Sequence, residues 1–353
     1  MCGINGVFFK KNKSEKEISG TLSKMNGKII HRGPDEDGFY AKAKQEFSIG
    51  MAMRRLSIID LSTGKQPMFS EDGKIAIVFN GEIYNYRQLK NDLLKKNVEF
   101  LTTSDTEVIL RLYEQHGTSS FKMLDGMFAF SIFDENKNKL LITRDFFGEK
   151  PLYYANFENK IFWASELKSI MAVADKKPEI SKEGLNLYLQ LTYIPAPFSI
   201  YEGIHKLPPN HYLELDCSNS STKIVEIENE LQTNIDPDIS FEEAKRQTHD
   251  LVTESVKSRS VADVPLGTFL SGGVDSSIVS LALAQQEENK IDTFSVGFEK
   301  KSFDETDKSR VVADIIGSSH HEFIISVDDL KDNINNILLN FDEPFADSSS
   351  LPT

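Results

Sequence analysis

The chain is 353 residues long and carries a formal net charge of −14, from 40 Lys and Arg against 54 Asp and Glu. A chain of this length is expected to form two or three domains, each able to bury its own core. The acidic balance, without a basic stripe interleaved with aromatic residues, argues against nucleic acid as a partner. No apolar run approaches the roughly 18 residues that a membrane span needs, and GVFF runs directly into KKNKSEKE, which is not a signal-peptide pattern. We therefore expect a cytoplasmic protein with no membrane partner.

The two cysteines are Cys2 and Cys217. Two cysteines so far apart in a reducing compartment are poor evidence for a disulfide. Cys217 lies in LELDCSNSS, which reads as a strand followed by a polar turn. We interpret it as a structural thiol and expect any chemistry to come from Cys2.

The first half of the chain reads as short strands with two well-marked helices. KIAIVF at 74–79 is a compact apolar strand that is expected to end at Asn80-Gly81. NYRQLKNDLLKK then has helical spacing, with Asn85 as its predicted N-cap. Strand, tight turn and helix are therefore expected in that order.

A second helix is predicted after VEFLTT. The sequence Ser104-Asp105-Thr106-Glu107 has the pattern of a capping box, and Gly117 is placed to end the helix. GMFAFSIFD and NKLLITRD flank the polar ENKN and predict a hairpin of buried strands, and KIFWAS adds another strand. Together these segments favour stacked β-sheets with helices outside, an α+β arrangement.

The pattern changes beyond residue 240. The stretch 175–240 is rich in prolines and turn-forming residues, so we place a domain boundary near 230–240. After it, helical and extended segments alternate: FEEAKRQTHDLVTESVKSR, VPLGTFL, SSIVSLALAQQ, DTFSVGF, ETDKSRVVADIIG, HHEFIIS and DDLKDNINNILLN. Such alternation predicts a parallel sheet with crossover helices.

Cys2 is a candidate nucleophile. If Met1 is removed, the thiol stands beside its own α-amino group, which titrates near neutrality and can act as the base. This is the chemistry of an amino-terminal nucleophile, and Gly3 is expected to leave room for a substrate. Taken alone, a cysteine at position 2 is more often accidental than catalytic.

Further polar groups at the ends of apolar segments strengthen this interpretation. Attack on an amide needs an oxyanion hole, for which the side chain of Asn80 and the backbone N–H of Gly81 are candidates. An α-amino acid substrate needs a cation for its carboxylate and acids for its ammonium. Arg55, Glu82 and Asp105 fit that demand.

Each of these residues also has a plain structural alternative. Asn80-Gly81 could form only a turn, and Asp105 could be only a favourable charge at a helix N-terminus. Arg55 could be a surface residue, and HRGPDEDG at 31–38 a turn-rich loop. For each residue taken alone, the structural alternative is favoured. When all of them are considered together, the functional interpretation is favoured.

A second constellation is FLSGGVDSS at 269–277. A strand running into Ser271-Gly272-Gly273 and then a helix brings bare backbone N–H groups and a helix N-terminus to one place, as a phosphate requires. Ser276 could add a donor, and Asp275 could reach a phosphate-bound magnesium ion. No lysine follows the glycines as in the Walker pattern, which favours release of pyrophosphate over γ-phosphate transfer. The structural alternative is a glycine-rich turn.

With these residues in view, the chain resembles the glutamine-hydrolysing asparagine synthetases over essentially its whole length. The resemblance is carried by MCGI, HRGPD, RRLSIID, NGEIYNY, SDTEVIL, GMFAFSIFD, RDFFGEKPLYY, ASELK, LSGGVDSS, FSVGF and DEPFADSSSLPT. It implies an α+β amino-terminal αββα sandwich of the amino-terminal-nucleophile type, followed by an α/β parallel-sheet ATP-pyrophosphatase domain. The expected boundaries are a glutaminase domain at 2–212, a linker at 213–239 and a partial synthetase domain at 240–353.

The resemblance also implies a role for each candidate residue. Cys2 would attack the glutamine amide with its own α-amine as base, and ammonia would pass through an internal tunnel to an aspartate that ATP has adenylated. ATP and Mg²⁺ are the implied cofactors, glutamine and aspartate the implied substrates, and a homodimer the implied assembly. The implied site residues are Asn80 and Gly81 for the oxyanion, Arg55, Leu56, Ile58, Glu82 and Asp105 for glutamine, Leu270, Ser271, Gly272, Gly273, Asp275, Ser276 and Val296 for ATP, and Asp275 for magnesium.

One departure from the family pattern leaves alternatives open. The family's second glycine- and acid-rich loop follows the DEPF segment, whereas this sequence stops at Thr353. We therefore expect an incomplete synthetase half with exposed apolar surface and an unpaired sheet edge. The alternatives are an amidotransferase acting on another carboxylate, such as a sugar acid or a peptide aspartate, and a glutaminase-only or non-catalytic product. The Cys2 constellation argues against β-lactam-forming relatives, and SGGVDSS against phosphoribosyl and hexose phosphate amidotransferases.

Overall fold

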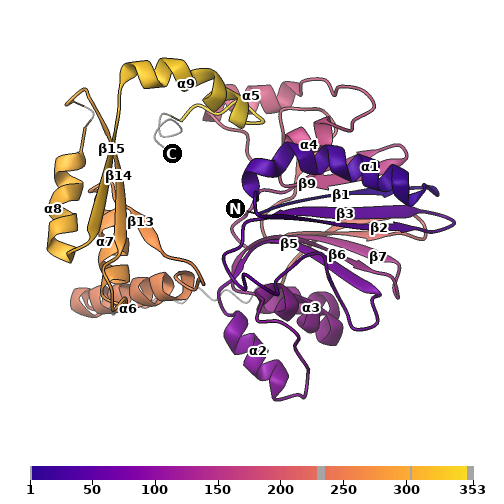
Figure 1. The fold of residues 1–353 in the computed structure, drawn as a ribbon, viewed down its shortest axis with the longest axis horizontal. Coiled ribbons are helices and arrows are strands. Elements are labelled where there is room, and N and C mark those ends of the chain that lie inside the picture. Colours follow the sequence, from indigo (N-terminus) through magenta and orange to yellow (C-terminus); the bar gives the residue numbers. More distant parts are fainter. Residues whose placement is uncertain (1, 229–234, 303, 348–353) are drawn as a thin grey trace. The chain divides into compact units, whose positions relative to one another are not determined.

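The computed structural model describes residues 2–228, 235–302 and 304–347. The chain divides into two compact units, one of residues 1–229 with 342–346 and the other of residues 230–341 with 347–353. Each unit is described by itself (Figure 1). The predicted removal of Met1 and the SSSLPT stretch at 348–353 lie outside the described residues.

The first unit contains two six-stranded sheets. The first sheet has the order β10-β8-β9-β1-β3-β2 and the second β12-β11-β7-β6-β5-β4. The strands are β1 (Gly3–Phe9), β2 (Glu36–Ala43), β3 (Ser48–Arg55), β4 (Met68–Phe69), β5 (Ile75–Ile83), β6 (Gly126–Asp134), β7 (Lys139–Arg144), β8 (Tyr153–Phe157), β9 (Lys160–Ala164), β10 (Ile204–Lys206), β11 (His211–Asp216) and β12 (Ser221–Glu226).

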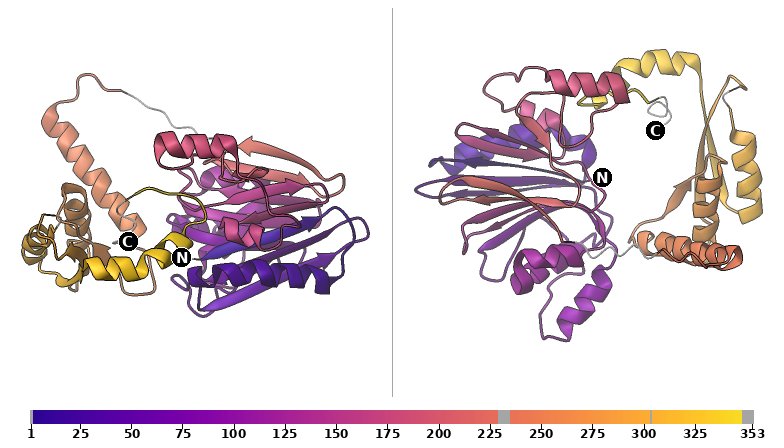
Figure 2. Two further views of the ribbon diagram at one scale, coloured as in Figure 1. Left: turned by 90° about the horizontal axis from the view of Figure 1, so that it is seen from above. Right: turned by 180° about the vertical axis from the view of Figure 1, so that it is seen from behind.

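Helices cover the outer faces of the two sheets. Figures 1 and 2 show the sheets as stacked layers, with α1 and α4 outside the first and α3 outside the second. This is the expected αββα sandwich. The helices of the unit are α1 (Glu15–Asn26), α2 (Tyr86–Leu94), α3 (Asp105–His116), α4 (Leu167–Met171) and α5 (Lys182–Leu191), with 3₁₀ turns at Gly27–Arg32 and Gly117–Met123.

The first sheet is buried on both faces, which is why β1 is apolar throughout. Ile4 and Phe8 point into the core between the sheets, while Val7 and Phe9 pack in the core under the helices, as the two-residue period of a strand requires. A Cβ on Gly6 would lie 2.0 Å from the ring of Trp163. Glycine at this position therefore lets the one tryptophan of the chain enter the inter-sheet core.

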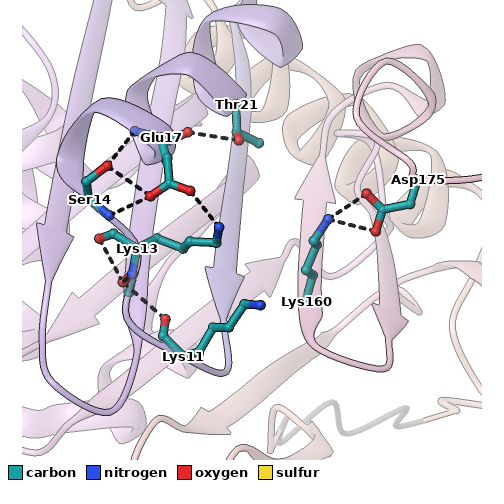
Figure 3. A network of polar contacts seen from close by, with 8 residues as sticks. Lys11, Lys13, Ser14, Glu17, Thr21, Lys160 and Asp175 are labelled. Atoms are coloured by element: carbon teal, nitrogen blue, oxygen red, sulfur yellow. Dashed lines mark hydrogen bonds and ion pairs between the residues drawn. The ribbon is translucent and has the colours of Figure 1, made fainter.

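Helix α1 begins with a complete capping box, which the sequence analysis did not single out. The Ser14 hydroxyl accepts the N–H of Glu17, and a carboxylate oxygen of Glu17 accepts the N–H of Ser14 over 3.0 Å (Figure 3). Lys13 Nζ lies 2.6 Å from the other carboxylate oxygen of Glu17. These contacts satisfy donors that a helix start leaves without partners, and they fix where the helix leaves β1.

The second unit has a three-stranded parallel sheet of order β13-β14-β15, as the alternation of helices and strands predicted. Its elements are α6 (Phe241–Arg259), β13 (Gly267–Phe269), α7 (Val274–Ala284), β14 (Asp292–Phe298), α8 (Thr306–Ile316), β15 (Ser319–Ile325) and α9 (Val327–Asn340). Phe269 and Val274 are 77% and 75% exposed. The expected exposure of apolar surface is therefore found in this unit.

Two local predictions were wrong in detail. Strand β5 does not end at Asn80-Gly81 but continues to Ile83, so these two residues pair with β6 inside the sheet and form no turn. The predicted capping box at α3 is incomplete, because Ser104 accepts the N–H of Thr106 while Glu107 bonds the N–H groups of 101 and 102 in the preceding loop. In both cases a tertiary partner outcompetes the local pattern.

The structure differs from two further predictions, those for Asn85 and for the linker 213–239. Asn85 precedes α2 but does not cap it with its side chain, which instead bonds the backbone of Met123 and Asp125. Much of the predicted linker 213–239 is sheet, because β11 and β12 pair with each other and β11 pairs with β7. The hydrogen bonds and buried side chains of β11 draw this polar stretch into the first unit.

Candidate functional site

The first candidate site lies where β1 begins and β3 and β5 end. The antiparallel register places Gly3 opposite Arg54, so Cys2 reaches the chain that leaves β3 at Arg55 and Leu56. The second sheet contributes Asn80, Gly81 and Glu82 from the last part of β5. Asp105, the first residue of α3, completes the group.

All eight residues expected at the glutamine site line one cavity of about 190 Å³. The wall also contains residues for which no role in this site was predicted. The expected eight are Cys2, Arg55, Leu56, Ile58, Asn80, Gly81, Glu82 and Asp105, and the additional eight are Ile59, Gly64, Gln66, Phe79, Ser104, Thr106, Met127 and Lys150.

Cys2 is held by its side chain and by its main chain. Its Sγ accepts the backbone N–H of Leu56 over 3.3 Å, and its carbonyl oxygen accepts Nε of Arg32 over 2.8 Å. Burial raises the pKa of the Cys2 thiol, although the Leu56 N–H lowers it again in part. The thiol therefore needs a base to become a nucleophile. Gly3 makes room for Arg32, because a Cβ there would lie 2.9 Å from Cδ of Arg32.

Asn80 presents a donor without a partner. Its side chain is 1% exposed, and Nδ2 has no hydrogen-bond partner among the described residues. Leaving a buried N–H unsatisfied costs roughly 1–3 kcal/mol, so such a group is expected to gain a partner when a ligand binds. Gly81 cannot carry a side chain, because a Cβ would lie 2.1 Å from the carbonyl oxygen of Met127.

Arg55 is largely engaged before any substrate arrives. Its guanidinium is buried, with Nη1 2.8 Å from the carboxylate of Glu36 and Nη2 2.5 Å from the carbonyl oxygen of Asp60. Arg55 is therefore not the surface residue of the structural alternative. Its charge is fixed in the cavity wall.

Glu82 and Asp105 place two carboxyl groups in the same cavity. Burial raises the pKa of Glu82, an effect that the charge of Lys150 opposes. Burial raises the pKa of Asp105 to about 7, and the charge of Glu82 adds to the increase even though the N–H of Ile83 donates to Asp105 over 3.1 Å. A bound ammonium would favour the ionised form of both groups.

Lys150 is a cavity residue that the sequence analysis missed. It is 4% exposed, and burial lowers its pKa while the charge of Glu82 raises it. Arg144 donates to the carbonyl oxygen of Lys150 over 2.8 Å, and Asp145 accepts its N–H over 2.9 Å. No local pattern in RDFFGEKPLYY marks Lys150 as buried, because the same stretch also contains Arg144, Asp145 and Glu149.

The ATP candidates lie together in the second unit. Leu270 is buried and donates its N–H to Phe294 of β14 over 2.8 Å, which brings it beside the strand that carries Val296. Gly272 has φ +80, and Gly273 is the N-cap of α7 without a side-chain cap. In the described part of the chain, no side chain caps the start of α7, so its first N–H groups can bond an anion.

The hydroxyl groups of Ser271 and Ser276 lie 3.0 Å apart at this helix start, and Asp275 is exposed in the first turn. Among the described residues, no group of three or more His, Cys, Asp and Glu side chains could hold a metal ion. Asp275 alone fits only a magnesium ion held mainly by phosphate oxygens and water.

The thiols and the helices bear on the expectations of a structural Cys217 and of no membrane partner. Cys2 and Cys217 are both free thiols, and burial raises the pKa of Cys217 to about 12, which suits a structural thiol. In the described part of the chain, no helix is long and apolar enough to cross a membrane.

Comparison with known proteins defines first the class and then the family. Residues 1–225 match the glutamine amidotransferase domain model, and residues 247–353 match the asparagine synthase model. Asparagine synthetase 1 of Bacillus subtilis, described as glutamine-hydrolysing, is 37% identical over 100% of this chain and 54% of its own length. A Methanocaldococcus jannaschii protein assigned as a second such synthetase is 39% identical over 100% of this chain and 70% of its own length.

The first unit is thus a glutamine amidotransferase domain joined to an asparagine synthase sequence. The chain belongs to the family of glutamine-hydrolysing asparagine synthetases. It spans about half the length of the Bacillus subtilis relative. Among solved structures, the glutamine phosphoribosylpyrophosphate amidotransferase of Bacillus subtilis is 18% identical, covering 91% of this chain and 65% of its own, with a TM-score of 0.45.

Proposed function

We propose that the first unit hydrolyses glutamine to glutamate and ammonia with Cys2 as the nucleophile. The observation that carries the proposal is Nδ2 of Asn80, which has no hydrogen-bond partner among the residues that the structure describes and is buried in the same cavity as Cys2. A donor held ready where negative charge develops is the arrangement that stabilises a tetrahedral intermediate. Arg55, Glu82 and Asp105 supply the charges that an α-amino acid requires.

The chemistry follows from these groups. With Met1 removed, the α-amine of Cys2 takes the thiol proton, and Sγ forms a bond to the amide carbon of glutamine. The oxyanion accepts hydrogen bonds from Nδ2 of Asn80 and the N–H of Gly81 while the amine carries the proton to the leaving nitrogen. Ammonia departs and leaves a thioester on Cys2. Water then attacks the thioester carbon, releases glutamate and restores the thiol.

Glutamine binding follows from the same cavity. Arg55 faces the substrate carboxylate, and Glu82 and Asp105 face the ammonium. The charge of the ammonium offsets the cost of burying the carboxylates of Glu82 and Asp105. The backbone of Leu56 and Ile58 completes the wall that orients the side-chain amide toward Cys2. Leu56 has a second role, because its N–H also stabilises the thiolate form of Cys2.

We propose further that the chain takes part in asparagine synthesis. The phosphates of ATP would bind the N–H groups at the start of α7 and the hydroxyls of Ser271 and Ser276, with Leu270 and Val296 at the adenosine end. The aspartate side-chain carboxylate would attack the α-phosphate and release pyrophosphate, and ammonia would then displace AMP to give asparagine. Asp275 would hold Mg²⁺, which neutralises phosphate charge. The free N-terminus of α7 and the asparagine synthase match support this proposal.

We also propose a cytoplasmic location and a homodimeric assembly. The family implies a cytoplasmic protein that forms a homodimer, and two free thiols are consistent with a reducing compartment. An acceptor other than aspartate is the alternative that the first unit does not exclude, because the glutamine cavity is independent of the acceptor.

Incubation with amide-¹⁵N-glutamine, aspartate and MgATP tests the proposal, with the label followed by mass spectrometry. We expect the label in ammonia and in asparagine for the wild-type chain, and neither product for Cys2→Ala. Label in ammonia alone supports the glutaminase and contradicts synthesis from aspartate. Label remaining in glutamine, or an active Cys2→Ala protein, overturns the assignment of Cys2.

A further inference from the structure

A chain of charged side chains begins at the main chain of Cys2. Nε of Arg32 donates to the Cys2 carbonyl oxygen over 2.8 Å, and Nη1 of Arg32 lies 2.9 Å from Oε1 of Glu166. Both side chains are largely buried, with exposed fractions of 9% and 13%. The guanidinium of Arg32 is therefore held between the carbonyl oxygen of Cys2 and the carboxylate of Glu166.

Glu166, directly before α4, is itself held by two further side chains. His31 Nε2 lies 2.9 Å from Oε1, and Lys168 Nζ lies 3.0 Å from Oε2. Burial alone would raise the pKa of Glu166, but hydrogen bonds from Arg32, His31 and Lys168 hold it below its usual value. Glu166 is thus an anion that orients Arg32.

Lys168 connects Glu166 and Arg32 to Asp342, which is far away in the sequence. Its Nζ lies 3.4 Å from Oδ1 of Asp342, and its backbone N–H donates to Oδ2 of Asp342 over 3.1 Å. Asp342 begins the segment 342–346, the docked segment, which packs with the first unit although it falls within the asparagine synthase match.

The docked segment has a second charged anchor. Glu343 accepts the N–H of Ile200 over 2.8 Å and the hydroxyl of Tyr153 over 3.2 Å, and it lies 2.6 Å from Nζ of Lys206. Its side chain is 11% exposed. Two nearly buried carboxylates with cationic partners therefore fix the position of Asp342 beside Lys168.

We propose that Glu166 is a positioning residue for Cys2 and that the docked segment sets the reactivity of Cys2 through Lys168, Glu166 and Arg32. The inference rests on the proposed glutaminase function. Each link is a charge with little access to water, so removing one partner leaves the next charge uncompensated and free to move. Arg32 bonds the main chain between the α-amine and Gly3, and a displacement there misaligns amine, thiol and substrate amide.

Steady-state glutamine hydrolysis by the full chain tests the role of Glu166. We expect Glu166→Gln to lower kcat by about tenfold while KM changes less than about twofold, because the groups that contact glutamine are untouched. Lys168→Met and Asp342→Asn are expected to lower kcat by smaller factors, and Lys168→Arg to retain most of it. The matched control is Glu214→Gln, whose carboxylate lies 2.7 Å from Lys139 and 3.2 Å from Lys223 in the second sheet.

Two outcomes overturn the inference: wild-type kcat in Glu166→Gln, or an equal loss of kcat in Glu166→Gln and Glu214→Gln at matched melting temperatures. An inactive wild-type chain or an active Cys2→Ala chain contradicts the glutaminase proposal instead. In that case alkylation of Cys2 by iodoacetamide, read by peptide mass spectrometry, decides the positioning role without substrate. We expect faster alkylation in Glu166→Gln than in Glu214→Gln, and equal rates would refute the role. If Glu166→Gln does not fold, Asp342→Asn replaces it in both measurements.

Discussion

The backbone N–H of Leu56 points at Sγ of Cys2 over 3.3 Å, although the two residues are 54 positions apart in the sequence. The register between β1 and β3 creates this contact, since Gly3 pairs with Arg54. The proposed nucleophile is thus held by the strand beside it, and the same strand end carries Arg55. The thiol proposed as catalytic and the cation proposed to bind the substrate carboxylate are therefore positioned by one pair of strands.

Removing the amide of Asn80 is expected to remove most of the proposed glutaminase activity. Asn80→Ala should lower kcat by about 10²–10³, the usual effect of losing an oxyanion donor, with KM nearly unchanged. Because Nδ2 has no partner to lose among the described residues, the melting temperature should not fall by the amount typical of a lost buried hydrogen bond. Stopped glutaminase assays and thermal unfolding measure both effects. Full activity in the variant would exclude Asn80 from the oxyanion hole.

Asp105 is expected to strengthen glutamine binding and to lower the free energy of unfolding of the protein without substrate. Because its pKa rises from 3.8 to about 7 on folding, the folded protein keeps a proton that the unfolded chain has lost between those values. Stability therefore falls as the pH rises through this window, by roughly 4 kcal/mol in total. Asp105→Asn does not titrate, so its stability relative to the wild type should increase between pH 5 and pH 8 while KM for glutamine rises.

Urea unfolding at several pH values measures this difference, with Asp60→Asn as the control. Although burial opposes it, hydrogen bonds from Thr63 and Thr103 lower the pKa of Asp60 to about 2. The Asp60 variant should therefore be less stable than the wild type at neutral pH, the opposite sign. A pH-independent difference between Asp105→Asn and the wild type would contradict the raised pKa.

Asp275→Ala is expected to weaken MgATP binding and leave glutamine hydrolysis nearly intact. Asp275 is exposed in the first turn of α7 and belongs to the second unit, whereas the described residues that line the glutamine cavity all belong to the first unit. Titration calorimetry with MgATP and the glutaminase assay separate the two effects. Asp307→Ala, a change of the same type in the first turn of α8, provides the control. Equal ATP affinity in the wild type and Asp275→Ala would exclude this carboxylate from the nucleotide site.

Much of the fold was predictable because the apolar pattern is strong. The hairpin of β6 and β7, the helix that ends at Gly117 and every helix and strand named after residue 240 occur where their patterns indicated. Predictions based on single polar residues were less successful. Asn85 and Glu107 each had a suitable local partner, yet both bond to other segments. Asn85 donates to the carbonyl oxygen of Met123 and accepts the N–H of Asp125, while Glu107 accepts the N–H of Thr102, because a side chain can bond any complementary group that the tertiary structure brings near.

By itself the sequence determined the two kinds of architecture, the family, and the eight expected residues that line the glutamine cavity. These follow from local periodicity and from motif order, both of which survive without knowledge of contacts. Only the tertiary structure decided that Asn80 lies within a strand, with an Nδ2 that no described residue bonds. The same is true of the place of Lys150 in the cavity wall and of the contact between Asp342 and Lys168, which joins the network behind Cys2. The physical reason is that burial and pairing depend on residues far apart in the chain, and these set both the pKa of a side chain and the partners that remain free.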